Sequence, residues 1–416
     1  MKIIFSLFIF ISVVFANDAT IEVIKKANTL PSIAIEDASI SYDDTFRIRF
    51  FKTLVADLNV ISIFNVDRHH RIANFNDVDV LFQNKDMNYV LRYKMFEDDN
   101  AALNVQIKLL EKNNEVFVKN YRVARRDIFM FISHAIAYDI NEYMGKTPVT
   151  WMKRKVIFSR IVAPKKSEIV IADYTLAYQH VILKGGFNIF PKWANKEQTA
   201  FYYTTLNTLK PTLKYVDIKT GKVKNIISSE GMMVCSDVSA DCKTLLLTMT
   251  TSGQPDIYSF NTVTKKYKRL TRYSGIDVNG QFMNKNQIVF ISSRLGYPNV
   301  FTKHLDTDEV EQMVYYGRSN VSCSAHGNYV VYAARESSNA FSKNTFNLHL
   351  ISTKSDFIRR LTATGINQFP KFSKDGDAII FIKNYKGQSA IGIIRLSYNK
   401  NYLFPLKYGR IQSMDW

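Results

Sequence analysis

Cysteine, glycine and proline are scarce in this chain of 416 residues, which contains 3 Cys, 16 Gly and 9 Pro. Three cysteines cannot all pair with one another, so at least one thiol is free even in an exported protein. A bridge between Cys235 and Cys242 remains open, because spacing alone does not fix its geometry, and Cys323 is expected to be buried and inert. Few Gly and Pro beside 29 Phe and 23 Tyr indicate a strand-rich interior.

Long apolar runs are also lacking, since none reaches the roughly 20 residues of a membrane-spanning helix. The apolar run from Ile3 to Phe15 follows Lys2 and ends at Ala16, a pattern that predicts a signal peptide cleaved after about Ala16. No Cys follows this run, which argues against a lipid anchor. We therefore expect an exported chain that does not span the membrane. Its net charge of +18 would face envelope partners rather than nucleic acid.

Catalytic signatures are missing as well. The sequence has no Gly-x-Ser-x-Gly, His-Glu-x-x-His, Gly-x-x-x-x-Gly-Lys or Cys-x-x-Cys motif. His69 and His70 stand between arginines, which would repel a metal ion, and are predicted to lie in a surface loop. The carboxylates of Asp375 and Asp377 fall where hairpin turns favour Asp and Gly. The prediction is a protein without catalytic residues, metal or cofactor.

In residues 17–148 the apolar side chains recur with helical spacing in some segments and with strand spacing in others, which predicts an α+β domain. Apolar residues recur at helical spacing in 46–58 and 127–144, with Asp127 expected to cap the second helix. Strands are expected at 31–35, 61–64, 89–96, 103–110 and 116–123, of which the last three should form an antiparallel meander.

Residues 149–416 are predicted to form short strands in a degenerate repeat of about 40 to 50 residues, which is the period of a propeller blade. Its best copy is the hairpin Gln368–Gly376, with the Ser-x-Asp-Gly turn. The aromatic or apolar anchors of the copies are Trp193, Val238, Phe282, Cys323, Phe372 and Trp416. The last anchor has no strands after it, and 156–184 has strands without an anchor. We therefore expect 410–416 to pair with 156–184 and close a six-bladed ring.

Propellers bind partners at a mouth of the central channel, on loops that lead into the innermost strands. The polar and adaptable residues just before each anchor are the candidates for partner contact. These are Asn188, Ile189, Met233, Val234, Asp277, Val278, Asn279, Arg318, Ser319, Asn320, Asn367, Gln368, Ile411 and Gln412.

A signal peptide, a small α+β domain and six blades with a worn Pro-x-Trp/Phe-Ser-x-Asp-Gly motif together resemble the TolB family of the Tol-Pal system. The motif is complete at Pro370–Gly376, partial at Pro191–Trp193 and decayed at Ser239–Cys242 and Ser324–Gly327. The resemblance implies a periplasmic, non-enzymatic adaptor that supports outer-membrane integrity and invagination at cell division. A Pal-like lipoprotein would bind at the channel mouth, other outer-membrane or peptidoglycan-associated proteins being further partners.

The resemblance also implies that the mature N-terminal segment takes part in TolA binding. Its residues here are Ala19, Thr20, Ile21, Glu22, Val23 and Ile24, whose alternation suits β-strand addition. Two alternatives come from other functional classes: an exported hydrolase or lyase built on the propeller, and a carbohydrate-binding propeller on the cell wall.

Overall fold

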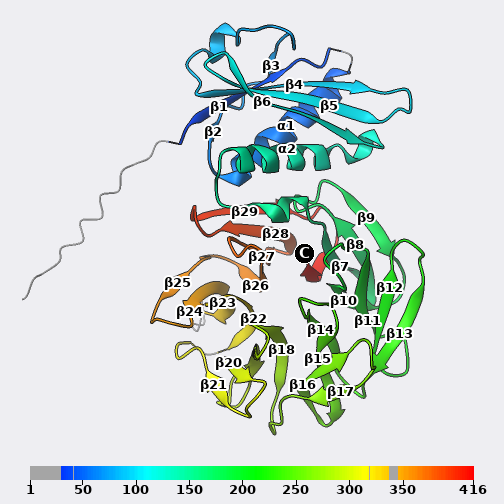
Figure 1. Ribbon diagram of the computed structural model, residues 1–416. Coiled ribbons are helices and arrows are strands. Elements are labelled where there is room, and N and C mark those ends of the chain that lie inside the picture. The colour runs from blue at the N-terminus through cyan, green and yellow to red at the C-terminus, as the bar shows by residue number, and fades with distance from the viewer. Residues whose placement is uncertain (1–29, 41, 318, 337–344) are drawn as a thin grey trace, which may run out of the picture. The chain divides into compact units, whose positions relative to one another are not determined.

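The computed structural model describes residues 30–40, 42–317, 319–336 and 345–416. Residues 31–416 form one compact unit, in which a small α+β region precedes a succession of β-sheets (Figure 1). The expected signal peptide and the segment Ala19–Ile24 lie outside the described residues. In the part of the chain that is described, no helix is both long and apolar enough to span a bilayer.

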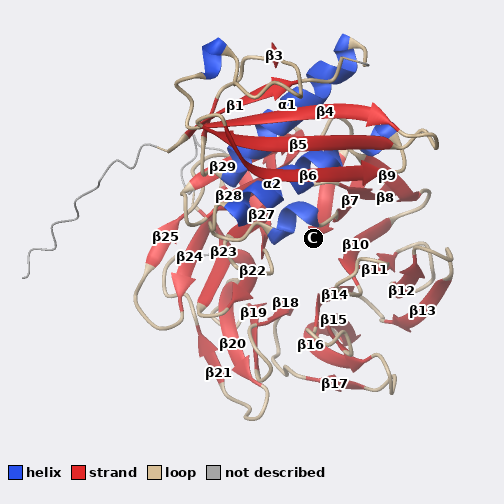
Figure 2. Ribbon diagram, turned by 45° about the horizontal axis from the view of Figure 1, so that its top comes forward, coloured by secondary structure: helices blue, strands red, loops and turns tan. Residues whose placement is uncertain are grey.

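The α+β region packs two helices on one face of a mixed sheet (Figures 1 and 2). The helices are α1 (Asp44–Ile61) and α2 (Met130–Tyr143). The strands are β1 (Ser32–Asp37), β2 (Asn65–Val66), β3 (Arg71–Ile72), β4 (Tyr89–Glu97), β5 (Leu103–Glu111) and β6 (Asn114–Val123). Strand β1 runs parallel to β4, and β4, β5 and β6 form the expected antiparallel meander. Short 3-10 turns are η1 (Phe82–Asn84), η2 (Arg126–Ile128) and η3 (Thr150–Lys153).

Two details of this region differ from the sequence prediction. The predicted strand at 61–64 is wrong, because α1 continues to Ile61 and Ser62 ends it in the left-handed conformation with φ of 67°. Asp127 does not cap α2, which starts at Met130 after the turn η2, and its carboxylate pairs with Arg125 at 2.9 Å instead. Both differences concern the ends of helices, where local propensity is weakest.

Beyond η3 the chain forms sheets that follow one another around a common centre (Figure 1). Three sheets have four strands each: β10 (Asn188–Trp193), β11 (Ala200–Thr205), β12 (Thr212–Asp217), β13 (Val223–Ser228); β14 (Met233–Val238), β15 (Thr244–Ser252), β16 (Gln254–Asn261), β17 (Tyr267–Arg269); β18 (Asp277–Phe282), β19 (Gln287–Ser292), β20 (Asn299–His304), β21 (Val310–Gln312).

The next eight strands join through a single parallel pairing of β24 with β26. They are β22 (Asn320–His326), β23 (Tyr329–Arg335), β24 (Phe346–Ser352), β25 (Ile358–Arg360), β26 (Ile366–Phe372), β27 (Ala378–Tyr385), β28 (Gln388–Arg395) and β29 (Lys400–Pro405). The described residues after 149 therefore form a many-stranded β-propeller.

The first and last strands of the propeller lie in one sheet, of order β30-β7-β8-β9. Its strands are β7 (Val156–Ala163), β8 (Lys166–Ala172), β9 (Gln179–Leu183) and β30 (Arg410–Asp415). Met414 lies opposite Phe158 in the antiparallel pairing of β30 with β7. The expected pairing of 410–416 with 156–184 is therefore present. Trp416 is buried behind it, and its indole N–H donates to the carbonyl of Phe372 at 3.1 Å.

Buried charges link the α+β region to the propeller sheets. His134 of α2 contacts Asp57 of α1 at 2.8 Å through Nδ1 and Asp173, after β8, at 3.1 Å through Nε2. Burial disfavours the imidazolium, but the two carboxylates outweigh it and raise the pKa of His134 to about 10. Arg395 of β28 pairs with Asp377 at 2.7 Å and donates to the carbonyl of Ile61, the last residue of α1, at 2.9 Å.

Candidate binding site in the channel

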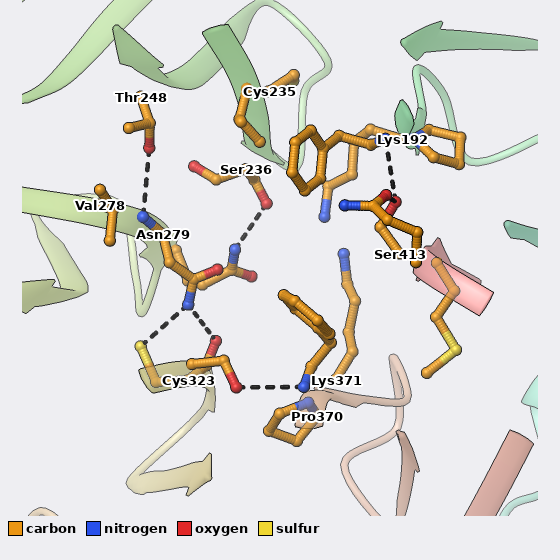
Figure 3. Close-up of a pocket in the computed structure, with 18 of the residues that line it drawn as sticks. Lys192, Cys235, Ser236, Thr248, Val278, Asn279, Cys323, Pro370, Lys371 and Ser413 are labelled. Carbon is orange, nitrogen blue, oxygen red and sulfur yellow. Dashed lines mark hydrogen bonds between the residues drawn. The ribbon is translucent and has the colours of Figure 1, made fainter. Parts of the chain in front are cut away.

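Six strands that we call the inner strands, β10, β14, β18, β22, β26 and β30, surround a hollow of about 250 Å³ (Figure 3). We call it the channel hollow. It is lined by Phe190, Pro191, Lys192, Met232, Val234, Cys235, Ser236, Thr248, Val278, Asn279, Gln281, Val321, Ser322, Cys323, Phe369, Pro370, Lys371, Gln412, Ser413 and Met414. Most of these side chains are apolar, and the two charged ones are both lysines. The hollow can therefore accept an inserted apolar segment of a partner.

A strained backbone position shapes the wall on alternate inner strands. Phe190, Asn279 and Phe369 have φ of 54°, 57° and 52°, and each lies within a β-bulge of its strand. Their amides donate to hydroxyls on β30, β15 and β22, at 3.0 Å for Phe190, 3.2 Å for Asn279 and 3.2 Å for Phe369. Such strain is costly for non-glycine residues and persists where the surroundings enforce it, which is common at binding sites.

A second set of backbone hydrogen bonds occurs three residues later on the same three strands, β10, β18 and β26. The amides of the anchors Trp193, Phe282 and Phe372 donate to side chains of the preceding inner strands. The acceptors are Asp415, Asp237 and Ser324 respectively. Each of the two aspartates directly precedes an anchor, Trp416 or Val238. Ser324 occupies the equivalent position, so the fourth anchor is the next residue, Ala325. The predicted anchor Cys323 is therefore two residues too early.

Two lysines and two aspartates form a cluster at the floor of the channel hollow, in which Lys192 and Asp415 are buried and Asp237 and Lys371 are partly exposed. Asp415 Oδ1 lies 3.2 Å from Lys192 Nζ and 2.5 Å from Lys371 Nζ, and Asp237 Oδ1 lies 3.5 and 3.7 Å from the same atoms. Burial lowers the pKa of Lys371, whereas the carboxylates overcome burial and raise the pKa of Lys192. The cluster carries no net charge, and only its lysines line the channel hollow.

The structure brings some of the predicted contact residues to the channel hollow and places others elsewhere. Val234, Val278, Asn279 and Gln412 line it. Predicted residues outside its lining are Asn188, Ile189, Met233, Asp277, Ser319, Asn320, Asn367, Gln368 and Ile411. Arg318 and the segment Ala19–Ile24 lie outside the described residues.

Several of the predicted polar residues make hydrogen bonds within the fold. The side-chain amides of Asn188, Asn320 and Asn367 donate to Gly185 O at 2.8 Å, Asn299 Oδ1 at 2.8 Å and Phe346 O at 2.9 Å. Asp277 is fully buried and pairs with Arg294 at 3.2 Å. Their polarity in the sequence therefore reflects buried hydrogen bonding between strands as well as any role at a surface.

The contact residues predicted from sequence do not include the aromatic and basic residues of the hollow. Phe190-Pro191-Lys192 and Phe369-Pro370-Lys371 repeat the same tripeptide on β10 and β26. In each tripeptide the phenylalanine has a positive φ, the proline lines the hollow, and the lysine belongs to the charged cluster at its floor. The exact repetition of Phe-Pro-Lys before an aromatic anchor was the signal that could have identified them.

The three cysteines are free thiols. The bridge between Cys235 and Cys242 that the spacing left open is therefore not formed. Cys323 is buried as expected, and burial raises the pKa of its thiol to about 12, so it stays protonated at neutral pH.

Comparisons with known proteins identify relatives of the whole chain. The family of TolB beta propeller domains matches residues 150–416. The Tol-Pal system protein TolB of Wolinella succinogenes is 49% identical over 423 residues, covering 100% of both chains. That of Helicobacter hepaticus is 41% identical and covers 97% of this chain and 96% of its own. The crystal structure of TolB from Acinetobacter baumannii matches with a TM-score of 0.75 over 93% of this chain at 18% identity, a likeness of fold.

Proposed function

Because the chain belongs to the TolB family of Tol-Pal system proteins, we propose that it is a non-enzymatic adaptor of the periplasm. A Pal-like, peptidoglycan-associated lipoprotein binds its propeller, and TolA binds its N-terminal region. The adaptor thereby supports outer-membrane integrity and invagination during cell division. Its signal peptide, residues 1–16, is removed on export.

The observation that carries this proposal is the channel hollow. It gathers residues from all six inner strands into one concave, mainly apolar wall of about 250 Å³. Its lining includes the exposed side chain of Met232 and the half-buried side chains of Val234, Phe190 and Met414. Adaptable methionines and rigid rings on strained backbone suit the insertion of a loop from a folded partner.

We further propose the boundaries of the parts. Residues 17–148 form the α+β domain with its N-terminal segment, and 149–416 form a propeller of six blades that β30 closes. The pairing of β30 with β7 and the six inner strands around one hollow support this count. Most of the contact residues predicted from sequence lie on the inner strands themselves and not in the loops before them, and Val234, Val278, Asn279 and Gln412 are the ones that line the hollow.

The binding experiment uses the mature chain and the soluble domain of the Pal-like lipoprotein from the same organism. The variant M232K with V234K places two charges at the hollow and is expected to weaken binding at least about tenfold by calorimetry, because the lysines lack partners there. The matched control V223K with V263K adds the same charges on exposed positions of the outer surface and should bind like the parent. Equal affinity of both variants would remove this face as the docking site.

The N-terminal proposal has a separate test. We propose that Ala19–Ile24 adds as a strand to an edge of TolA. Deleting these residues should abolish capture of TolA while leaving the affinity for the Pal-like lipoprotein within about twofold. Undiminished capture of TolA would contradict this assignment.

A further inference from the structure

A second hollow, of about 270 Å³, lies at the opposite end of the inner strands, and we call it the rear hollow. Lys192 and Lys371 line both hollows, so the cluster that they form with Asp237 and Asp415 lies between the two. Loops that follow the inner strands form its rim, including those at Asn195–Lys196 and Ser373–Lys374. The contact residues proposed for the lipoprotein lie at the other end. The rear hollow therefore has no role in the function proposed above.

Three cations line this hollow without a carboxylate partner. Arg154, Lys196 and Lys374 come from three separate segments, and in the described chain none of them forms an ion pair. The guanidinium of Arg154 is half-buried, and its Nη1 donates to the carbonyl of Lys196 at 3.0 Å. A guanidinium carries five N–H groups, and within the described residues the side chain of Arg154 makes no other hydrogen bond. Burial lowers the pKa of Arg154, and the charges of Asp415 and Glu197 only partly oppose this.

The carboxylates in the rear hollow are already neutralised. Asp415 contacts both lysines of the cluster and accepts the amide of Trp193 at 2.9 Å. Asp237 lies near the same lysines and accepts the amide of Phe282 at 2.9 Å. An incoming anion therefore meets a neutral floor and three unpaired cations at the rim.

Charge and shape together indicate the ligand class. A planar guanidinium with two flexible ammonium groups suits a multiply charged oxyanion better than a single carboxylate. Rings of Trp193, Phe372 and Trp416 form part of the wall and offer apolar contact to whatever carries the anion. We propose that the rear hollow is a binding site for phosphate groups, supplied either by a soluble phosphate compound or by a phospholipid headgroup.

The test uses the full mature chain and three probes: inorganic phosphate, pyrophosphate, and phosphatidylcholine vesicles with and without phosphatidylglycerol. The variant R154Q with K374Q removes two rim charges. The matched control K222Q with K400Q removes two charges from exposed residues outside the hollow. Thermal melting of all three proteins shows that the variants are folded.

We expect pyrophosphate or phosphatidylglycerol vesicles to bind the parent and the control alike, and the R154Q with K374Q variant at least about tenfold more weakly. Binding of the soluble probe alone identifies a phosphate compound as the ligand, and binding of the vesicles alone identifies a headgroup. The proposal is overturned if no probe binds the parent, or if the two double variants lose affinity equally. Neither result would affect binding of the lipoprotein, which is measured at the other hollow.

Discussion

At the scale of single residues, His134 is a buried cation held between two carboxylates. Its pKa of about 10 lies above the ordinary value near 6.5. The protonated form therefore stabilises the fold fully below about pH 6.5, and this contribution disappears as the pH rises toward 10. The free energy of unfolding of the parent should fall between pH 7 and pH 10.

The variant H134Q isolates this contribution. It should be less stable than the parent at pH 7 by about 3 to 5 kcal/mol, because Asp57 and Asp173 lose their counter-charge. The difference should shrink toward pH 10, where about half of the parent molecules have lost this proton. Urea denaturation at both pH values measures it, and a difference that does not change with pH would contradict the charged state of His134.

Arg395 connects a propeller strand to the end of a helix. It is fully buried, pairs with Asp377 and donates to the carbonyl of Ile61 at the negative end of the α1 dipole. The variant R395M should lose about 3 to 5 kcal/mol, since Asp377 keeps its charge and loses its partner. The control R272M changes an exposed arginine and should stay within about 0.5 kcal/mol. Equal denaturation midpoints for R395M and the parent would show that the contact is dispensable.

At the scale of elements, strand β30 holds the two ends of the propeller in one sheet. Deleting residues 410–416 removes the partner of β7, the buried ring of Trp416 and the carboxylate of Asp415. We expect a loss of more than about 5 kcal/mol, because the ring alone accounts for about 3 to 5 kcal/mol. Calorimetric melting provides the measurement, and a truncated chain that melts like the parent would refute closure by this strand.

Elements with strong periodicity could be predicted from the sequence. The apolar spacing of residues 46–58 located α1, and three alternating runs located β4, β5 and β6. The short strand near residue 65 could not be placed, because the helix before it ends only when Ser62 adopts a left-handed conformation. Asp127 offered a cap by type, yet it lies in the turn η2, three residues before α2 begins, and pairs with its sequence neighbour Arg125.

The candidate site could be predicted only in outline. The repeat located the beginnings of the inner strands, but one-residue bulges decide which of their side chains face inward. For this reason Asn188 and Asn367 are buried in the fold while Phe190 and Phe369, two residues later, line the hollow. A bulge leaves little trace in a single sequence.

At the scale of the whole molecule, residues 31–416 are one compact unit. A single hydrophobic cluster includes residues of α1 and α2 together with Trp151, Ile393 and Trp416 of the propeller region. The buried charges of His134 and Arg395 also connect the two regions.

We therefore expect the mature chain to unfold in one cooperative calorimetric transition, and R395M to lower that whole transition. The isolated fragment 149–416 should be much less stable than the same residues within the chain, because it exposes Asp173 and Arg395. Two well-separated transitions in the parent would contradict this coupling.

Residues with positive φ recur within alternate inner strands, so the channel wall repeats every two inner strands, about 90 residues from Trp193 to Phe282 and again to Phe372. The wall of the channel hollow therefore has approximate threefold rather than sixfold symmetry. Two of the three equivalent positions have the sequence Phe-Pro-Lys, and the third has Asn279 and Gln281 in place of the phenylalanine and lysine. Because this third position differs chemically from the other two, an inserted loop can be bound in one rotational orientation in preference to the other two.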